Sequence, residues 1–521
     1  MIDADQLNQL DAQQLRDVVR SLMGTVSTQQ RQIERQDHEI AFKQALIDKI
    51  NHEMAVLKRL KFAARSEAFN AEQKSLLDET IDTDLAALQA ELDVVLPVDK
   101  GERNTPRRQV LPAHLPRREI HHEPNSTTCR CGCALKRIGE DVAEKLDYQP
   151  GVFTVERHVR GKWVCTQCET LVQAPVPPHI IDKGIPTTGL LAQVLVAKYV
   201  DHLPLYRQEN IFGRAGHPIA RSTLAQWVGS CGTQLQPLVD ALKDELLKHA
   251  VLHADETPVA MLKPGNGKTH RAYLWSYCTT SFNPMRAVVF DFAESRAGQH
   301  AREFLGVAED RWRGTLVCDD FSGYKAMFEL GITEAGCLAH ARRKFHELWV
   351  NHQSAVGEEA LKFFVQLYEI EREVQALDAD ERRRIRQFKA VPIAERMHEW
   401  LIVQRQRVPT GSATARAIDY SLNRWTALMR YVDDGDVPCD NNWVENQIRP
   451  IAIGRNNWLF AGSLRAGKRA AAVMSLVHSA KLNGHEPFAY LRDVLERLPT
   501  QPASRIRELL PYRWTRAAAS T

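Results

Sequence analysis

The chain has 521 residues, a formal net charge of +3, 44% hydrophobic residues and 26% charged residues. This length predicts several domains, and the composition excludes a fibrous or globally disordered protein. No apolar run reaches the ~18 residues of a membrane span, and residues 1–5 are acidic where a secretory signal is basic and then apolar. We therefore expect a cytoplasmic protein with no membrane contact.

A heptad repeat marks residues 12–60. Its a positions are all apolar, namely Val19, Val26, Ile33, Ile40, Ile47 and Met54. The d positions are apolar at both ends and polar in the middle, in the order Leu15, Leu22, Gln29, Gln36, Lys43, Ile50 and Leu57. A sustained period of 3.5 residues predicts a parallel, self-associating coiled coil within a helical region 1–96. The alternative is one long amphipathic helix that folds back on its own chain.

Proline and arginine are concentrated in residues 97–124. Frequent prolines are unfavourable for a helix or a central strand, so this composition predicts a basic linker. The arginines lie either in solvent or along a phosphate backbone.

Five of the 10 cysteines lie between residues 129 and 168. Cys165 and Cys168 form a C-x-x-C pair after a strand-like run. The second pair comes from Cys129, Cys131 and Cys133, whose spacing leaves the choice open. Four thiolates around Zn²⁺ form a closed structural site, so we predict one zinc ion in a β ribbon spanning 125–180.

Two alternatives to this cysteine site remain open. In the first, His121 and His122 contribute zinc ligands. In the second, the cysteines are small core residues that bind no metal.

Residues 181–245 show the apolar period of short helices, with a glycine-containing turn at 213–218. Ser222 stands where it would cap the last of these helices. The pattern is typical of a DNA-binding helix-turn-helix and also of any small helical bundle.

Strand patterns alternate with helices in residues 246–465. The expected strands are 251–253, 273–278, 287–292, 316–318 and 334–338, with a helix opened by Ser295 that runs to 305. Three strands in hairpin succession, followed by strand and helix units, predict a mixed α/β sheet of the ribonuclease H kind. Charged helices at 345–435 form an insertion in this domain, and a C-terminal helical segment covers 466–521.

Three carboxylates occur at sites where this sheet would gather them. Asp255 is expected just past the first strand, Asp319 at the end of the fourth, and Glu445 at the start of a later helix. Clusters of carboxylate oxygens suit Mg²⁺ or Mn²⁺, and two such ions support phosphoryl transfer. The trio therefore indicates nuclease-type chemistry, although a single aspartate at a strand end is commonly a solvated turn residue.

Several motifs stand out along the chain. They are Phe62-Ala63-Ala64-Arg65-Ser66-Glu67, Pro204-Leu205-Tyr206-Arg207, Asp255-Glu256-Thr257, Asp319 with Gly323-Tyr324, Cys337-Leu338-Ala339-His340-Ala341-Arg342-Arg343, Asn441-Asn442 with Glu445, Gly454-Arg455-Asn456-Asn457-Trp458-Leu459-Phe460, and the tail from Ser475 to Leu498. With the heptads and the cysteines, they resemble the transposases of the insertion sequence 66 (IS66) family nearly end to end.

The resemblance implies a D-D-E transposase with a ribonuclease H-like core and a helical insertion before the glutamate. Asp255, Asp319 and Glu445 would be its metal-binding triad, with two Mg²⁺ ions. Asp320 replaces what is more often glycine, and we assign Asp319 as the ligand from its register with Gly323 and Tyr324.

Cationic and sulfur-bearing residues near the triad add to this prediction. Asn446 follows the glutamate where the family commonly has arginine, which leaves other cations to contact DNA. The candidates are Arg449, Arg455, Arg342, Arg343 and Lys344. Cys337 and His340 form a C-x-x-H element that either supports catalysis or packs the junction between the sheet and the insertion.

The favoured hypothesis is an enzyme that binds the terminal inverted repeats of its mobile element, cleaves them and joins the ends to target DNA. The resemblance implies a bacterial, nucleoid-associated protein, self-association through the coiled coil and accessory proteins of the same element. Two alternatives are a dimeric zinc-containing DNA-binding regulator with a vestigial core, and a nuclease that cuts without strand transfer.

Overall fold

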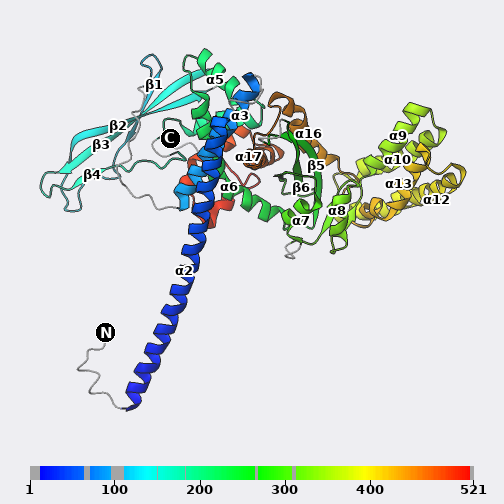
Figure 1. Cartoon of the computed structure of the whole chain (residues 1–521), viewed down its shortest axis with the longest axis horizontal. Helices are drawn as coiled ribbons and strands as arrows, with labels where there is room; N and C mark the ends of the chain where they lie inside the picture. The colour runs from blue at the N-terminus through cyan, green and yellow to red at the C-terminus, as the bar shows by residue number, and fades with distance from the viewer. Residues whose placement is uncertain are drawn as a thin grey trace. The chain divides into compact units, whose positions relative to one another are not determined.

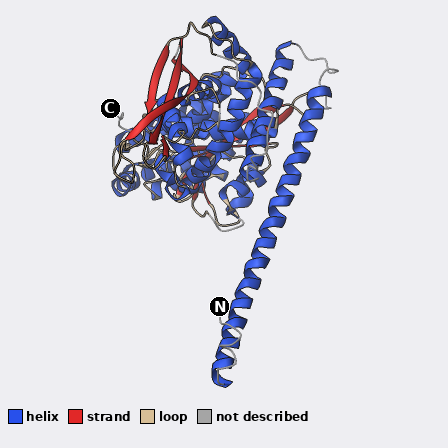
Figure 2. Ribbon diagram, turned by 90° about the vertical axis from the view of Figure 1, so that its left-hand side faces the viewer, coloured by secondary structure: helices blue, strands red, loops and turns tan. Residues whose placement is uncertain are grey.

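The computed structural model describes residues 12–63, 71–95, 111–149, 151–181, 184–263, 268–307 and 312–516. These residues separate into two compact units. The first contains residues 12–63 and 88–95, and the second contains 71–87 and the described residues from 111 onward. Helices make up most of the secondary structure (Figure 2). None of the helices in the described ranges combines the length and the apolar character that a membrane crossing requires.

The heptad region forms one continuous helix, α2, Ala12–Ala63, followed by α3, Ala71–Val95 (Figure 1). The prediction of a helical N-terminal region is confirmed. Val26 and Ile40 of the a row are 60% and 64% exposed, whereas Ile50 is buried. The side chain of Leu15, the motif residues 64–67 and the linker residues 97–110 lie outside what the structure describes.

A four-stranded sheet follows, with the order β1-β3-β2 and β4 paired to β3. The strands are β1 Arg117–His122, β2 Leu135–Gln149, β3 Val152–Cys165 and β4 Leu171–Gln173. β2 and β3 form a long antiparallel hairpin, and β1 pairs with β3 in parallel.

The prediction of a linker was wrong for residues 117–122, which form the edge strand β1. Pro112 and Pro116 stand before the strand, so neither removes a donor from its ladder. The exposed, charged character of this segment is common for an edge strand.

Three helices come next, namely α4 Thr188–Tyr199, α5 Leu205–Arg214 and α6 Arg221–Leu246. The predicted cap at Ser222 is wrong, because α6 begins at Arg221 and its N-cap is Ala220, two residues earlier. The carboxylate of Glu209 accepts a 3.0 Å hydrogen bond from the backbone N–H of Arg221 instead. A side chain from the preceding helix thus satisfies this free helix donor.

The second sheet is mixed and five-stranded, in the order β7-β6-β5-β8-β9. Its strands are β5 Val251–Met261, β6 His270–Thr279, β7 Val288–Ala293, β8 Thr315–Val317 and β9 Thr333–Ala335. β5, β6 and β7 are antiparallel, while β5, β8 and β9 are parallel.

Helices connect the strands of this sheet, cover it or form the insertion between β9 and α16, where they pack mainly on one another. They are α7 Gly298–Leu305, α8 Ser322–Phe328, α9 Leu338–His352, α10 Ala355–Val374, α11 Ala379–Ile385, a π-helical turn Arg386–Ala390, α12 Val391–Arg407, α13 Ala413–Asn423, α14 Trp425–Leu428, α15 Arg430–Asp433, α16 Asn442–Gly454, α17 Leu464–Leu482 and α18 Pro487–Arg497. Ser295 does not open α7, which begins after Ala297, because the Ser295 hydroxyl accepts from the N–H of Ala297 in a local turn.

α17 covers the edge strand β7. The hydroxyls of Ser475 and Ser479, one helical turn apart, accept hydrogen bonds from the N–H groups of Phe290 and Val288. These bonds satisfy donors of an edge strand that would otherwise need a further strand. α17 is therefore part of the packing of the five-stranded sheet.

Candidate active site and zinc centre

Asp255 lies inside strand β5 and not just past its end, because β5 continues to Met261. Sequence reasoning ended the strand early, since Asp, Glu and Pro are all unfavourable in strands. β5 is the central strand of the sheet. Asp319 follows the end of the adjacent parallel strand β8 by two residues, so both aspartates come from neighbouring strands.

Glu445 lies in the first turn of α16, as predicted, and α16 packs on β5 and β6. The buried Asn441 just before α16 fixes this position. Its side chain bonds the His253 ring at 2.8 Å and donates to the Ala254 carbonyl at 2.9 Å. Glu445 is thereby attached to the same strand that carries Asp255.

The charges of the other two predicted carboxylates act on Asp255. Burial is the main cause that raises the pKa of Asp255 well above its ordinary value, and the charge of Glu256 adds to it. The negative charges of Asp319 and Glu445 raise the same pKa further. The charges of both other predicted ligands therefore act on Asp255, and a divalent cation would offset this repulsion.

Asp319 and its neighbour Asp320 face different surroundings. Asp319 accepts a 3.0 Å hydrogen bond from the N–H of Phe321, and its charge acts on Asp255. Asp320 instead lies 3.2 Å from the amine of Lys325 and 3.5 Å from the guanidinium of Arg424. The two ion pairs direct Asp320 toward cations and away from the carboxylate group.

Glu256 is a buried carboxylate that sequence reasoning did not assign. One oxygen pairs with Arg296, and the other accepts a 2.7 Å bond from the Tyr324 hydroxyl. Burial raises its pKa, and the charge of Asp319 contributes. The adjacent pair Asp255-Glu256 was a signal in the sequence, and successive residues of a strand point to opposite faces of the sheet.

The predicted DNA-contacting cations are spread around this site. Arg449 and Arg342 are exposed. Arg343 is exposed as well, with its guanidinium 3.9 Å from Glu445. The guanidinium of Arg455 donates a hydrogen bond to the Pro258 carbonyl of β5.

Lys344 lies over the ring of Tyr420 at 4.5 Å from its centroid, in the helical insertion. Among the predicted cations, Arg455 and Lys344 thus have structural partners, while Arg449 and Arg342 point to solvent.

Cys337 and His340 lie close to Glu445, at the start of α9. The His340 Nδ1 atom is 3.8 Å from Glu445 Oε1. Burial raises the pKa of the Cys337 thiol to about 12, and its sulfur accepts from the N–H of Asn441 at 3.2 Å.

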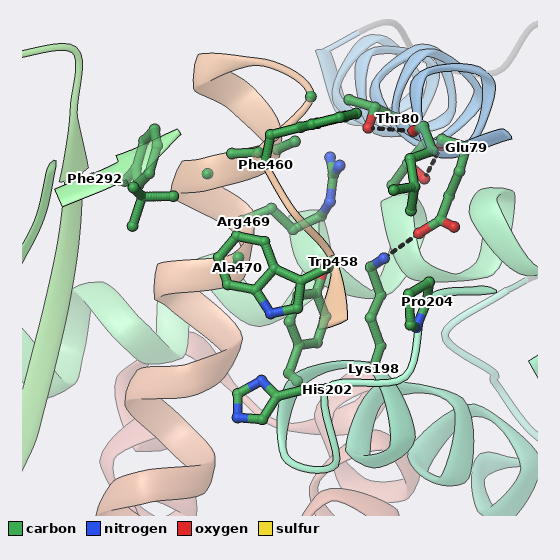
Figure 3. A pocket seen from close by; sticks show the side chains of 18 of the residues that line it. Glu79, Thr80, Lys198, His202, Pro204, Phe292, Trp458, Phe460, Arg469 and Ala470 are labelled. Carbon is green, nitrogen blue, oxygen red and sulfur yellow. Dashed lines mark hydrogen bonds and ion pairs between the residues drawn. The ribbon is translucent and has the colours of Figure 1, made fainter. Parts of the chain in front are cut away.

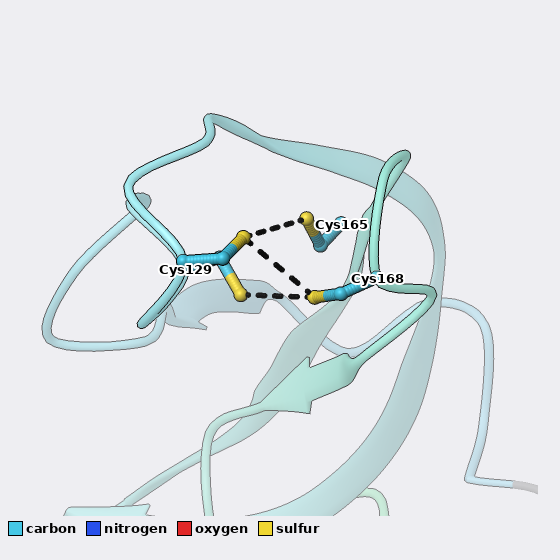
Figure 4. A group of neighbouring side chains, drawn as sticks. Cys129, Cys165 and Cys168 are labelled. Atoms are coloured by element: carbon cyan, nitrogen blue, oxygen red, sulfur yellow. Dashed lines mark hydrogen bonds between the residues drawn. The ribbon is translucent and has the colours of Figure 1, made fainter.

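A second cluster joins Cys129, Cys131, Cys165 and Cys168, whose sulfur atoms lie within 4.8 Å of one another (Figure 4). Cys133 is not in this group. The predicted zinc pairs are thus brought together across the open end of the β2–β3 hairpin, and four thiol groups at this spacing suit a tetrahedral zinc ion.

Local hydrogen bonds lower the pKa of two of these cysteines. A bond with the Thr170 hydroxyl at 3.1 Å is the first cause that lowers the pKa of Cys168 to about 6. The backbone N–H of Cys168 lowers the pKa of Cys165 in turn. Both thiols are therefore inclined toward the thiolate form that binds zinc.

The alternative histidine ligands have other partners. His122 bonds and stacks with His158, at 2.9 Å between ring nitrogens. His121 lies 3.5 Å from a Glu119 carboxylate oxygen. Neither belongs to the cysteine group.

A cavity of about 90 Å³ lies beneath α3, α4 and α17, apart from both centres (Figure 3). The Lys198 amine forms an ion pair with Glu79 at its wall. Trp458 and Phe460 of the Gly454–Phe460 motif line it too. This motif therefore contributes to packing beside strand β5, where the N–H of Ala461 donates to the Ala260 carbonyl.

Family models match most of the chain. The model described as "Transposase IS66 family" matches residues 183–469, and "IS66 C-terminal element" matches 475–512. The model described as "zinc-finger binding domain of transposase IS66" matches 126–169. The model described as "Transposase C of IS166 homeodomain" matches 49–120.

The chain is also similar to proteins of Sinorhizobium fredii strain NGR234 that are described only as uncharacterized. It is 35% identical to y4jD over 89% of this chain and 94% of that protein. It is 37% identical to y4qI, over 88% and 87%, and 33% identical to y4hP, over 91% and 89%. The zinc-finger match and the cysteine cluster together support a structural zinc.

Proposed function

The chain belongs to the IS66 transposase family, and we propose that it cleaves the inverted-repeat ends of its own mobile element and joins them to target DNA. DNA is its partner, since the family's DNA-binding and zinc-binding elements are present. The proposal concerns the reaction, the residues that perform it and the assembly in which it occurs.

We propose that residues 246–465 form a ribonuclease H-like catalytic core. The observation that carries this proposal is the position of the acidic residues on the sheet of order β7-β6-β5-β8-β9. Asp255 is on the central strand, Asp319 follows the neighbouring parallel strand, and Glu445 is on α16, which packs against β5 and β6.

Asp255, Asp319 and Glu445 would hold two Mg²⁺ or Mn²⁺ ions. The raised pKa of Asp255 and the oxygen-only donor set fit this role, because a divalent cation favours the charged carboxylates. When bound, such ions activate the attacking oxygen and stabilise the leaving oxygen of the phosphodiester.

The remaining groups position this site and the DNA. Arg296 and Tyr324 hold the carboxylate of Glu256 in place. Arg449 lies one helical turn after Glu445 and is exposed, so it is placed to contact a phosphate near the carboxylates.

The experiment that tests this function incubates the purified chain with labelled element-end DNA and Mg²⁺. We expect nicks at the element ends and joined products, with neither on a scrambled end sequence. Nicks without joining would support the nuclease alternative, and binding without any cut would support the regulator alternative.

We further propose that α2 pairs chains as a parallel coiled coil. The exposure of Val26, Ile33 and Ile40 in the single chain supports this, because a row of exposed apolar side chains at heptad spacing is stabilised by a second helix.

Lysine at Ile33 and Ile40 would bury two unpaired ammonium groups in the seam. We expect this double variant to become monomeric by light scattering and to bind one DNA end without forming a paired-end complex. A monomeric unmodified chain, or normal pairing by the variant, would contradict the proposal.

A further inference from the structure

We propose that Cys337, His340 and Glu445 form a second zinc site, and that zinc bound there withholds Glu445 from the catalytic metal ions. The withholding step rests on the proposed catalytic role of Glu445. The zinc site itself rests on geometry alone.

The three ligand groups come from the starts of two helices. Cys337 is the N-cap residue of α9, His340 is in the first turn of α9, and Glu445 is in the first turn of α16. One sulfur, one ring nitrogen and one carboxylate oxygen from these residues all lie within 4.8 Å of one another. This is the spacing of donor atoms around a single ion.

Backbone hydrogen bonds hold the two helix starts together. The N–H of Leu338 donates to the Cys439 carbonyl at 3.0 Å, and the N–H of Asn441 donates to the Cys337 sulfur at 3.2 Å. The ligand group is therefore built on fixed elements, and zinc binding needs no rearrangement of the backbone.

Two of the donor atoms have no hydrogen-bond partner. His340 Nδ1 and Glu445 Oε1 are both buried and make no hydrogen bond within the described ranges, although they face each other at 3.8 Å. Arg343 approaches the other oxygen of Glu445, at 3.9 Å, and leaves Oε1 directed at His340. A metal ion between them would satisfy both atoms, which are costly to bury unpaired.

The donor types select the ion. A thiolate and an imidazole bind Zn²⁺ well, whereas Mg²⁺ prefers oxygen ligands in an octahedral arrangement. Three protein ligands leave the fourth tetrahedral position open to water. The site therefore differs from the closed group of cysteines near residue 129, and we expect its zinc to exchange more readily.

Sharing Glu445 makes the two metal sites mutually exclusive. The carboxylate that completes the proposed triad is the same one that faces His340. Zinc held by Cys337 and His340 therefore competes for Glu445 with the ions on Asp255 and Asp319. The expected consequence is that added Zn²⁺ inhibits cleavage supported by Mg²⁺.

Zinc stoichiometry tests the site without any activity measurement. We would dialyse the full chain against buffered free Zn²⁺ and determine bound metal by elemental analysis. We expect about two ions per chain for the unmodified protein and about one for Cys337→Ser and for His340→Ala. Cys231→Ser is the matched control, since Cys231 is a fully buried thiol in α6 outside the cluster, and it should retain both ions.

Co²⁺ provides a spectroscopic check on the same variants. Removing Cys337 should lower the thiolate-to-cobalt absorption, and circular dichroism would verify that each variant is folded. Equal zinc content in the unmodified chain and in both folded variants would overturn the site. If one of Cys337→Ser and His340→Ala does not fold, the other still tests the site, because the two variants remove different ligands.

Inhibition tests the withholding step. With Mg²⁺ fixed, and with rates normalised to each variant's own rate without zinc, His340→Ala should need about tenfold or more Zn²⁺ for half inhibition. An unchanged inhibitory concentration would overturn withholding. If Glu445→Gln cleaves DNA normally, the proposed catalytic role fails, while the zinc content of Cys337→Ser still decides the site.

Discussion

The two sheets of this chain are stabilised in different ways. In the five-stranded sheet, β6 and β7 are almost entirely buried, and β7 is covered by α17. In the four-stranded sheet, β3 alternates between buried and partly exposed positions. The first sheet is held by a hydrophobic core, and the second is too thin to build one along its length.

The ends of the β2–β3 hairpin make this contrast sharper. Leu146 and Phe153, near the turn, belong to the main hydrophobic core. At the open end the buried cluster contains only Cys129, Leu135 and Cys165. At the cysteine end of the hairpin, a metal ion therefore has to provide the stability that side-chain packing provides at the turn end.

Zinc removal should produce the largest effect. It should unfold part of the four-stranded sheet and leave the five-stranded sheet folded. Structural zinc contributes on the order of 10 kcal/mol in small zinc domains, so Cys165→Ser or a chelator should unfold the cysteine end. Hydrogen exchange should rise in residues 128–137 and 163–172 and stay slow in β6 and β7. We expect purified protein to keep about one tightly held zinc ion, and protein free of zinc with a protected cysteine end would contradict the comparison.

The next largest effect concerns the carboxylates on the five-stranded sheet. Asp255→Ala, Asp319→Ala and Glu445→Gln should each lower cleavage by at least about 10³-fold, because each is proposed to hold metal. DNA binding and the melting temperature should change little, since these groups do not read bases. Asp320→Ala is the matched control and should be much milder. Equal loss for Asp320→Ala, with none for Asp319→Ala, would reverse the assignment.

A buried ion pair tests how the five-stranded sheet is covered. The Arg469 guanidinium of α17 lies 3.0 Å from the Asp84 carboxylate of α3, and the two side chains are 6% and 1% exposed. Asp84→Ala leaves a buried charge unpaired and should cost about 3 kcal/mol in chemical denaturation. The double variant Asp84→Leu with Arg469→Met should recover most of this loss. A single variant as stable as the parent would mean that solvent reaches Arg469.

The smallest effect separates two candidate caps of α6, a helix that also packs on β7. Glu209→Ala removes the acceptor of the Arg221 N–H and should cost about 1 kcal/mol. Ser222→Ala should change stability by less than about 0.5 kcal/mol. Urea denaturation of both variants provides the measurement. A larger loss for Ser222→Ala would restore the cap suggested by the sequence pattern.

Periodic patterns predicted the elements well. The heptad row predicted α2, and the runs of apolar β-branched residues predicted the strands of the mixed sheet. Boundaries were less predictable, because tertiary pairing overrides local preference. β5 continues through Asp255 and Pro258 since β6 pairs with it from Leu252 to Met261.

The candidate site was predictable where chemistry depends on single residue types. Asp255, Asp319 and Glu445 were predicted from motifs, and the charges of Asp319 and Glu445 both act on Asp255, while their role as metal ligands stays a prediction. The partners of Glu256 were not predictable, because Arg296 and Tyr324 are distant from it in the sequence and no local pattern links either of them to Glu256. The partner of the Arg221 N–H was missed for the same reason, since a cap from another helix leaves no local pattern.

The bonds of Asn441 have a consequence for how this protein can change over evolution. They tie the segment before Glu445 directly to β5, so the helical insertion of residues 345–435, which begins after β9 and ends before Asn441, is a closed excursion from the sheet. Its length can change without moving the glutamate, provided that this asparagine keeps its two partners. The insertion is thus free to diversify, or to be shortened in the laboratory, while the reaction geometry stays constant.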